Sequence, residues 1–381
     1  MMIVALASVA IWAGLLAAHG GFWRARETDE EAVTEPHAWP EVTAVVPARD
    51  EADVIGRAIA SLVAQDYPGR FRIVLVDDGS SDGTADIALA RAAGSERLTV
   101  ISGSPPPGSW TGKLWAMQSG IEEAGTSPRY LWFTDADIEH APSTLRSLVA
   151  RAEHDGLAMN SLMAELRCES AAEKAFVPAF VFFFQMLYPF ARVNRPSSRV
   201  AAAAGGCMLV NRASLESAGG LGAIRGALID DCALGALMKE QGSIRLTLTR
   251  RCRSIRPYGG WRDIGAMISR SAYAQLRYSP LLLLGTLAGM ALVYVNPLVL
   301  AVTGPAWIHA AGGAAWLMMT IAFQPMLRFY GRSPLWGAAL PLIGLFYAGA
   351  TWISAWHHWR GRGGMWKGRV QAARRRPTVA R

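Results

Sequence analysis

A stretch of 49 residues without Asp, Glu, Lys or Arg, residues 279–327, constrains the fold of this chain more than any other feature. About 20 apolar residues cross a bilayer as a helix, so this stretch predicts two membrane helices, with a turn near Gly304 and Pro305. Residues 333–356 predict one further span, although prolines and glycines interrupt it. We therefore expect a C-terminal transmembrane region over residues 280–357.

Residues 1–23 also lack charged side chains, and the first charges, Arg24 and Arg26, follow the apolar run. A secretory signal carries its positive charge before the apolar run, so this order favours an uncleaved N-terminal anchor. The positive-inside rule puts the flank that follows the anchor in the cytoplasm. We interpret residues 24–40 as a linker and residues 261–279 as an interfacial segment.

The excess of basic over acidic residues lies at the C-terminal end of the sequence. The formal net charge is +8, and residues 358–381 hold eight basic and no acidic side chains, so the rest of the chain is neutral. A basic tail beside apolar segments favours contact with lipid headgroups. No basic face with interleaved aromatic residues indicates a nucleic-acid partner. Three full spans would place the tail outside, so we expect one segment to lie in the interface or re-enter, which keeps the tail cytoplasmic.

The middle of the chain has a different pattern, in which short apolar runs alternate with helical periodicity. Four runs predict strands, at residues 42–46, 71–76, 98–101 and 130–133, and apolar residues at helical spacing over 54–63 predict a helix after the first strand. This alternation is typical of an α/β fold with a mostly parallel sheet that is covered on both faces.

Acidic side chains follow three of these strands, at Asp50, Asp78 and Asp135. Ligands bind at the carboxyl ends of parallel strands, so we expect these side chains to gather at one edge. Crowded carboxylates repel unless a cation lies among them, and Mg²⁺ and Mn²⁺ prefer oxygen ligands. Asp135 and Asp137 point to the same side if the chain stays extended; if the strand ends between them, one reaches a metal and the other a ligand. Taken alone, Asp-Ala-Asp is equally consistent with a polar strand end.

The cysteines form no CxxC pair and fit no zinc spacing. They predict reduced thiols in a cytoplasmic compartment, and small buried side chains are the favoured interpretation. The four are Cys168, Cys207, Cys232 and Cys252.

Five motifs follow one another between residues 41 and 278. They are Pro47-Ala48-Arg49-Asp50-Glu51, Val76-Asp77-Asp78-Gly79-Ser80 with Asp82-Gly83-Thr84, Gly112-Lys113, Asp135-Ala136-Asp137, and Asp230-Asp231-Cys232-Ala233-Leu234-Gly235. In this order they resemble family-two glycosyltransferases, inverting enzymes with the Rossmann-like GT-A nucleotide-sugar-binding fold. The apolar flanks resemble the membrane-bound branch that glycosylates lipids, including ceramide glucosyltransferases. The ending Trp366-Lys-Gly-Arg369 adds a likeness to hopanoid-biosynthesis-associated glycosyltransferases.

The resemblance implies a GT-A catalytic domain over residues 41–260 and a role for each matching residue. Asp231 would be the general base, and Asp137, with Asp135, would bind the divalent metal, Mg²⁺ or Mn²⁺. On the acceptor side would lie Gly205, Gly206 and Asp230. The nucleotide-sugar donor, a UDP-sugar by resemblance, would be bound by Pro47, Ala48, Arg49, Glu51, Asp78, Lys113, Asp135 and Arg277.

The chain departs from the family pattern in two places. Asp230 stands where the family usually has Glu, and helix capping is an alternative explanation for the Asp230-Asp231 pair; capping alone would lower the pKa of Asp231 and weaken it as a base. Processive members carry a Gln/Arg-x-x-Arg-Trp motif, whereas this chain has Ala274 at the first position, so Arg277 or Arg270 would contact the diphosphate. A phosphate-loop reading of Gly108–Lys113 fails because Leu114 replaces the Ser or Thr that binds magnesium.

Two further segments suit a lipid acceptor. Residues 176–190 are apolar, but Pro178 and Pro189 make them too short and broken to span comfortably, so they either line a lipid access route in the interface or form domain core. The small residues 201–207 either let the backbone approach a ligand or allow tight helix–sheet packing.

We expect a multi-pass enzyme of a bacterial-type inner membrane, with its catalytic domain facing the cytoplasm, that moves one sugar to a lipid hydroxyl. A hopanoid or ceramide-like acceptor and a polyprenyl phosphate remain alternatives, as does a catalytically silent nucleotide-sugar-binding scaffold.

Overall fold

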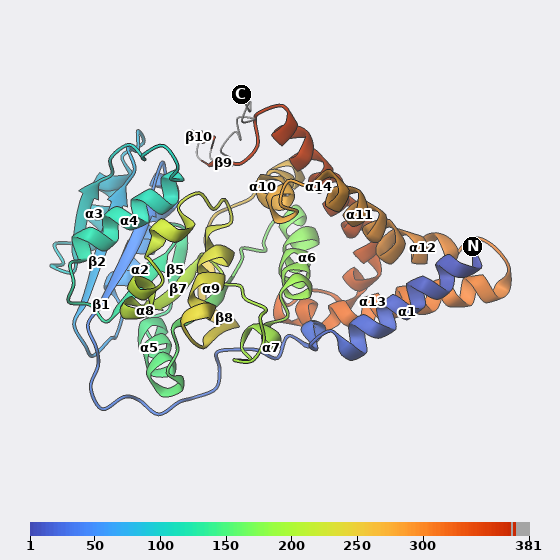
Figure 1. Cartoon of the computed structure of the whole chain (residues 1–381), viewed down its shortest axis with the longest axis horizontal. Coiled ribbons are helices and arrows are strands. Elements are labelled where there is room, and N and C mark those ends of the chain that lie inside the picture. Colours follow the sequence, from blue (N-terminus) through green and yellow to red (C-terminus); the bar gives the residue numbers. More distant parts are fainter. Residues whose placement is uncertain (367–368, 371–381) are drawn as a thin grey trace, which may run out of the picture. The chain divides into compact units, whose positions relative to one another are not determined.

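The computed structural model describes residues 1–366 and 369–370, which form two compact units that interleave along the chain (Figure 1). The helical unit comprises Met1–Arg26, Cys168–Ala191 and Pro257–Met365. The sheet unit comprises Glu27–Arg167 and Arg192–Arg256, together with the described residues Trp366, Arg369 and Val370. The acidic motifs all lie in the sheet unit, whereas Arg270 and Arg277 lie in the helical unit.

Within the described residues, the sheet unit contains an eight-stranded sheet in the order β3-β2-β1-β4-β7-β6-β8-β5. Strands β1 to β4 pair in parallel, whereas β7 runs antiparallel to both β4 and β6, and β5 runs antiparallel to β8. The strands are β1 Val42–Ala48, β2 Phe71–Asp77, β3 Leu98–Ser102, β4 Tyr130–Thr134, β5 Ile138–His140, β6 Met159–Glu165, β7 Cys207–Asn211 and β8 Ile244–Ser254. All four predicted strands are confirmed, and each runs one or two residues further than its apolar core. The other half of the sheet, β5 to β8, in which β6 and β8 pair in parallel, was not predicted.

Helices cover this sheet and bury apolar faces against it. In α2, the residues at helical spacing, Val54, Ile55, Ile59 and Leu62, are all buried. The last three pack in one core with β1 and β2 side chains. Burying each such side chain stabilises the fold by roughly 1.5–3 kcal/mol, before the conformational entropy that the side chain loses is subtracted. The helices of the sheet unit are α2 Ala52–Val63, α3 Thr84–Ala92, α4 Gly112–Ala124, α5 Thr144–Asp155, α8 Arg212–Ser217, η2 Leu221–Ile224 and α9 Asp230–Gln241, and the short α7 Phe190–Val193 lies where the two units join in sequence.

The helical unit holds the apolar segments. Among the described residues, four helical segments are long and apolar enough to cross a membrane: Ala171–Val193, Pro280–Leu300, Ala306–Phe329 and Pro334–Trp359. The predicted pair of helices in residues 279–327 is confirmed, with the break between Leu300 and Ala306. The helices are α1 Met2–Ala18, η1 Phe22–Arg24, α6 Ala171–Leu187, α10 Trp261–Gln275, α11 Pro280–Met290, η3 Ala291–Val295, α12 Asn296–Leu300, α13 Ala306–Phe329, η4 Pro334–Ala339 and α14 Leu340–Trp359. The short strands β9 Met365–Trp366 and β10 Arg369–Val370 follow, and Met365 is the last residue of the helical unit.

The interpretation of residues 176–190 as too broken to span was wrong. Helix α6 continues through Pro178, and with α7 it forms a segment of 23 residues. The helix is anchored at its start by a capping box, in which Ser170 and Glu173 each bind the other's backbone N–H. Such a cap satisfies backbone donors at the helix start, and a single interior proline removes only one backbone hydrogen bond. The segment up to Ala191 belongs to the helical unit, so it does not form the core of the sheet domain.

The N-terminal helix α1 has 17 residues and is shorter than the four candidate spans. Helix α10 occupies most of the predicted interfacial segment, residues 261–279. The basic tail predicted over residues 358–381, with the Trp366-Lys-Gly-Arg369 ending, falls largely on residues 367–368 and 371–381, which lie outside the described residues.

Candidate active site

The predicted donor-side residues lie at the carboxyl ends of β1 and β2, where parallel pairing sets Ala48 opposite Asp77. Asp78 is only 3% exposed, and the Arg49 guanidinium donates to its carbonyl oxygen and lies 3.8 Å from its carboxylate. Glu51 is also buried, and its backbone N–H donates to the Thr84 hydroxyl at 2.8 Å. This edge therefore presents a buried carboxylate with a fixed guanidinium beside it.

Asp50 has a local role that the sequence did not indicate. Its carboxylate accepts a hydrogen bond from the backbone N–H of Ser81 at 2.8 Å, and its own N–H donates to the Ser80 hydroxyl at 3.0 Å. Its φ of 49° lies in the left-handed region, which Asp tolerates better than most residues. Asp50 thus ties the β1 end to the turn after β2.

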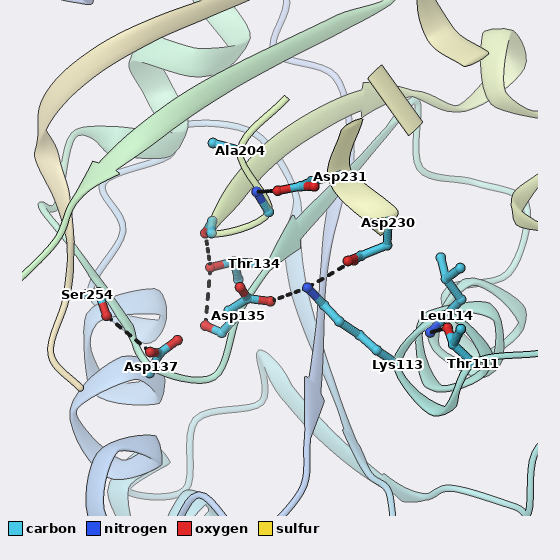
Figure 2. Close-up of polar contacts among 12 residues, drawn as sticks. Thr111, Lys113, Leu114, Thr134, Asp135, Asp137, Ala204, Asp230, Asp231 and Ser254 are labelled. Atoms are coloured by element: carbon cyan, nitrogen blue, oxygen red, sulfur yellow. Dashed lines mark hydrogen bonds and ion pairs between the residues drawn. The ribbon is translucent and has the colours of Figure 1, made fainter. Parts of the chain in front are cut away.

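Strand β4 ends at Thr134, so Asp135 and Asp137 lie in a turn and not in extended chain. Asp135 Oδ1 lies 2.8 Å from Lys113 Nζ, whereas Asp137 Oδ2 accepts from the Ser254 hydroxyl at 3.1 Å. Figure 2 shows the two carboxylates facing these different partners. The strand ends before both acids, so the chain is not extended through the motif, and the strand does not end between Asp135 and Asp137 as the second arrangement supposed. The two carboxylates still face different partners, as that second arrangement expected.

Lys113 joins two acidic segments that are distant in sequence (Figure 2). Its Nζ lies 2.8 Å from Asp135 Oδ1 and 3.0 Å from Asp230 Oδ2. It sits in the first turn of α4, which is capped by Thr111. A cation is disfavoured at a helix start, and burial alone would lower the pKa of Lys113. The carboxylates of Asp135 and Asp230 outweigh burial and raise this pKa, so the lysine stays charged.

Asp231 lies in the first turn of α9, which begins at Asp230. Its carboxylate accepts from the backbone N–H of Gly205 at 3.1 Å and from that of Cys232 at 2.7 Å. Burial, followed by the charge of Asp230, raises the pKa of Asp231 to about 6, although Lys113 and the two N–H groups act in the opposite direction. The expectation that capping sets a low pKa here is thus corrected, because burial and a neighbouring acid dominate.

Close backbone packing explains the small residues at positions 201–207. A Cβ on Gly235 of α9 would lie 2.7 Å from the carbonyl carbon of Ala202, so the helix contacts this segment directly. A Cβ on Gly205 would lie 3.4 Å from both Asp231 Oδ2 and Lys113 Nζ. Gly206 offers its carbonyl oxygen to the Thr134 hydroxyl at 2.9 Å. Tight packing therefore brings this backbone to the carboxylates.

The sequence reasoning missed Arg256. Its Nε donates to Asp137 Oδ2 at 3.0 Å, and its Nη2 donates to both carboxylate oxygens of Glu51 at 2.8 and 2.6 Å. The sequence signal that could have identified Arg256 is its spacing of two residues from Ser254 at the end of a strand, because residues two apart in a strand point to the same side of the sheet. Arg277, which the resemblance assigned to the donor, lies in the other unit, so its role stays a prediction.

The acids at the site have the chemistry of a hard divalent-cation site. Only Ala136 separates Asp135 from Asp137 in the sequence. Burial, together with the charges of Asp137 and Asp230, raises the pKa of Asp135, despite the opposing effect of Lys113. Lys113 and Arg256 now neutralise this charge. Oxygen ligands of this kind are those that Mg²⁺ and Mn²⁺ prefer, so the residues fit the metal that the resemblance implied.

A mixed, mostly parallel sheet with helices on both faces, acids at its strand ends and flanking apolar helices defines a GT-A nucleotide-sugar-binding fold with candidate membrane spans. A sequence model of the family described as "Glycosyl transferase family 2" matches residues 43–219. A mannosyltransferase from Pyrobaculum calidifontis, solved in complex with GDP-Man and Mn²⁺, has a similar structure, with a TM-score of 0.56 and 20% identity over 93% of this chain and 98% of that chain.

Two further comparisons are more distant or partial. The glucosyl-3-phosphoglycerate synthase of Mycobacterium tuberculosis with Mn²⁺ and UDP-glucose aligns with a TM-score of 0.39 and 22% identity over 62% of this chain and 78% of that chain. The 4,4'-diaponeurosporenoate glycosyltransferase of Staphylococcus aureus (strain MRSA252) is 33% identical over 97 residues, which are 26% of this chain. The match spans about a quarter of that relative's length, 24%.

Proposed function

We propose that this protein is an inverting, metal-dependent glycosyltransferase that moves one sugar from a nucleoside diphosphate sugar to a lipid hydroxyl. The observation that carries the proposal is the position of Lys113, which joins Asp135 at the end of β4 to Asp230 at the start of α9, beside Asp231. The acids assigned to the donor and to the base thus share one site in the sheet unit.

The donor nucleotide is assigned to the edge formed by β1 and β2. The buried Asp78 accepts hydrogen bonds from the nucleobase, and Arg49, fixed against it, contributes a donor on the same side. Glu51 helps to hold this edge through its ion pair with Arg256. The family match over residues 43–219, which includes this edge, supports the assignment.

The reaction requires a proton acceptor and a way to neutralise the leaving diphosphate. Asp231 takes the proton from the acceptor hydroxyl as the hydroxyl oxygen attacks the anomeric carbon from the face opposite the leaving group, which inverts that centre. A divalent cation held by Asp137 with Asp135 would neutralise the charge on the diphosphate. Lys113 contributes a fixed positive charge beside the same acids, without reorganisation during the reaction.

A lipid acceptor is supported by the apolar helices that flank the sheet unit in the sequence. The partial relatives named for diaponeurosporenoate point in the same direction. We assign a neutral lipid hydroxyl, as in a hopanoid or ceramide-like lipid, and place the protein in a bacterial-type inner membrane with the sheet unit in the cytoplasm.

The proposal is tested with full-length protein in lipid nanodiscs. Labelled nucleotide sugars are supplied one at a time with MnCl₂ and with lipid extracts, and products are identified by mass spectrometry. We expect the mass of a single hexose to be added to a neutral lipid. Addition to polyprenyl phosphate alone would replace the acceptor assignment. Donor binding without transfer or hydrolysis would indicate a silent binding protein and contradict the proposal.

A further inference from the structure

Three buried side chains with metal-binding atoms meet near the Asp135–Asp137 turn. Among the described residues, His140 of β5, Cys207 of β7 and Cys252 of β8 place one ligand atom each within 4.8 Å of one another. Their exposed fractions are 4%, 0% and 1%. This cluster contains two sulfur atoms and an imidazole, so its chemistry differs from that of the oxygen-rich carboxylate site.

The hydrogen bonds of His140 indicate which ring nitrogen is available. Its Nε2 lies 2.8 Å from the Thr134 hydroxyl, and that hydroxyl lies 2.9 Å from the carbonyl oxygen of Gly206. The hydroxyl has one proton, and donating it to the carbonyl leaves Nε2–H as the donor to Thr134. Nδ1 then carries a lone pair, and it is buried without a hydrogen-bond partner in the part of the chain that the structure describes.

Burial also lowers the pKa of His140 to about 3, so the imidazole is neutral at physiological pH, which is the form that binds metals. An unsatisfied buried acceptor costs free energy, and a metal ion is one group that would satisfy it. The hydrogen bond from Nε2 to Thr134 has the geometry of the outer contacts that orient metal-binding histidines.

The two cysteines provide the remaining donors. Trp132 Nε1–H donates to Cys207 Sγ at 3.3 Å, and such hydrogen bonds commonly support metal-bound sulfur. Burial and the adjacent Cys207 raise the pKa of Cys252, so the thiol of Cys252 is protonated until a cation displaces its proton. Neither side chain takes part in the proposed sugar transfer.

We propose that His140, Cys207 and Cys252 form a structural site for a thiophilic d10 metal ion, Zn²⁺ or Cu⁺. Thiolate and imidazole ligands favour these ions over Mg²⁺ or Mn²⁺. Metal–ligand distances of about 2.0–2.3 Å bring ligand atoms within roughly 4 Å of one another, so a contraction of at most about 1 Å would complete the site.

The site would connect the three segments that position the carboxylates. His140 is three residues after Asp137, and Cys252 is two residues before Ser254, which donates to Asp137. Cys207 is two residues after Gly205, whose N–H holds Asp231. An ion at this place would fix the turn, β7 and β8 relative to one another. The inference does not depend on sugar transfer, because its readout is metal content.

The test measures the metal in purified full-length protein by mass spectrometry after growth with added zinc and copper and dialysis against EDTA under reducing conditions. We expect about one zinc or copper ion per chain. Cys207→Ser and Cys252→Ser should lose it, whereas Cys168→Ser, a cysteine of the helical unit, should retain it. Zinc and copper counts distinguish the two ions.

A variant that preserves the core keeps the test decisive if the cysteine variants fail to fold. Trp132→Phe keeps an aromatic ring but removes the N–H that donates to Cys207, and it should weaken metal affinity by about 10- to 100-fold. Cobalt added to metal-free wild-type protein should produce thiolate charge-transfer absorption. Folded wild-type protein that holds no zinc, copper or added cobalt, or a Cys252→Ser variant with unchanged metal content, would overturn the proposal.

Discussion

Asp230 and Asp231 are adjacent, yet the structure gives them different partners. Asp230 pairs with Lys113, whereas Asp231 is held by two backbone N–H groups and has the raised pKa. Burial, and then the charge of Asp230, raise the pKa of Asp231 and so make it a stronger base. Two identical side chains therefore have different electrostatic surroundings, one beside a lysine and the other beside two backbone N–H groups.

The first prediction concerns Asp231. Asp231→Asn keeps the shape of the side chain but removes the proton acceptor, so transfer should fall by about 100- to 10,000-fold while donor binding stays within error. Donor binding is measured by calorimetry and transfer by labelled sugar in lipid. Asp86→Asn, an exposed acid in the first turn of α3, is the control and should be fully active. Full activity in Asp231→Asn would remove this residue as the base.

The second prediction follows from the pKa of Asp231, which is raised to about 6. A general base works only when deprotonated, so its active fraction is high above this pKa and falls below it. With saturating donor and acceptor, the turnover rate should be constant above about pH 7 and fall about tenfold per pH unit below about pH 5. A rate that does not change across this range would show that proton removal by Asp231 does not limit turnover.

The third prediction concerns the metal. Asp137→Ala removes the carboxylate that we assign to the divalent ion, so manganese-dependent donor binding should weaken, while binding measured without metal should change little. The donor dissociation constant is measured across a manganese titration. Glu139→Ala, at a half-buried acid that pairs with Arg57 and Arg253, is the control and should preserve the manganese response. An unchanged response in Asp137→Ala would refute its role as a ligand.

At the scale of elements, the parallel half of the sheet was predictable because each strand and helix has a local apolar period. The acids were predicted to follow strands, and they do. The sequence did not predict β5 to β8, because β7 and β8 pair with strands that are distant along the chain. Arg256 was missed with β8, since its contact with Asp137 depends on this long-range pairing. The raised pKa of Asp231 depends likewise on burial in the folded chain.

The packing of α9 on residues 202–203 provides the element-scale prediction. Gly235→Ala would place a Cβ 2.7 Å from the Ala202 carbonyl carbon, so α9 must move, and with it Asp231. We expect destabilisation of about 1–3 kcal/mol together with reduced turnover. Gly222→Ala, where an added Cβ meets nothing within 4 Å, should change stability by less than about 0.5 kcal/mol. Urea unfolding in detergent measures both, and equal stability of the two variants would contradict the packing argument.

At the scale of the whole molecule, the two units alternate along the chain. The sheet unit resumes at Arg192 after the apolar segment that contains α6, so no single cut separates it from the candidate spans. Sequence hydropathy predicted the C-terminal spans well because about 20 apolar residues are a local signal. It failed for α6, since two prolines looked disruptive and the helix accommodates Pro178 within its length.

The candidate spans lead to a simple expectation for the full-length protein. It should remain in the membrane pellet after alkaline carbonate washing and be released only by detergent, because helices of this length and composition are stable in the bilayer. A peripheral membrane protein in the same preparation should be released by the wash. Release of the full-length chain by carbonate would show that these helices do not cross the membrane.

An experimental structure with a nucleotide sugar and Mn²⁺ bound tests the account most directly. We expect the nucleobase to lie beside Asp78, the cation at Asp137 and the anomeric carbon facing Asp231, all within the sheet unit. A nucleotide bound elsewhere, or a cation without a carboxylate from the Asp135–Asp137 turn, would contradict the account.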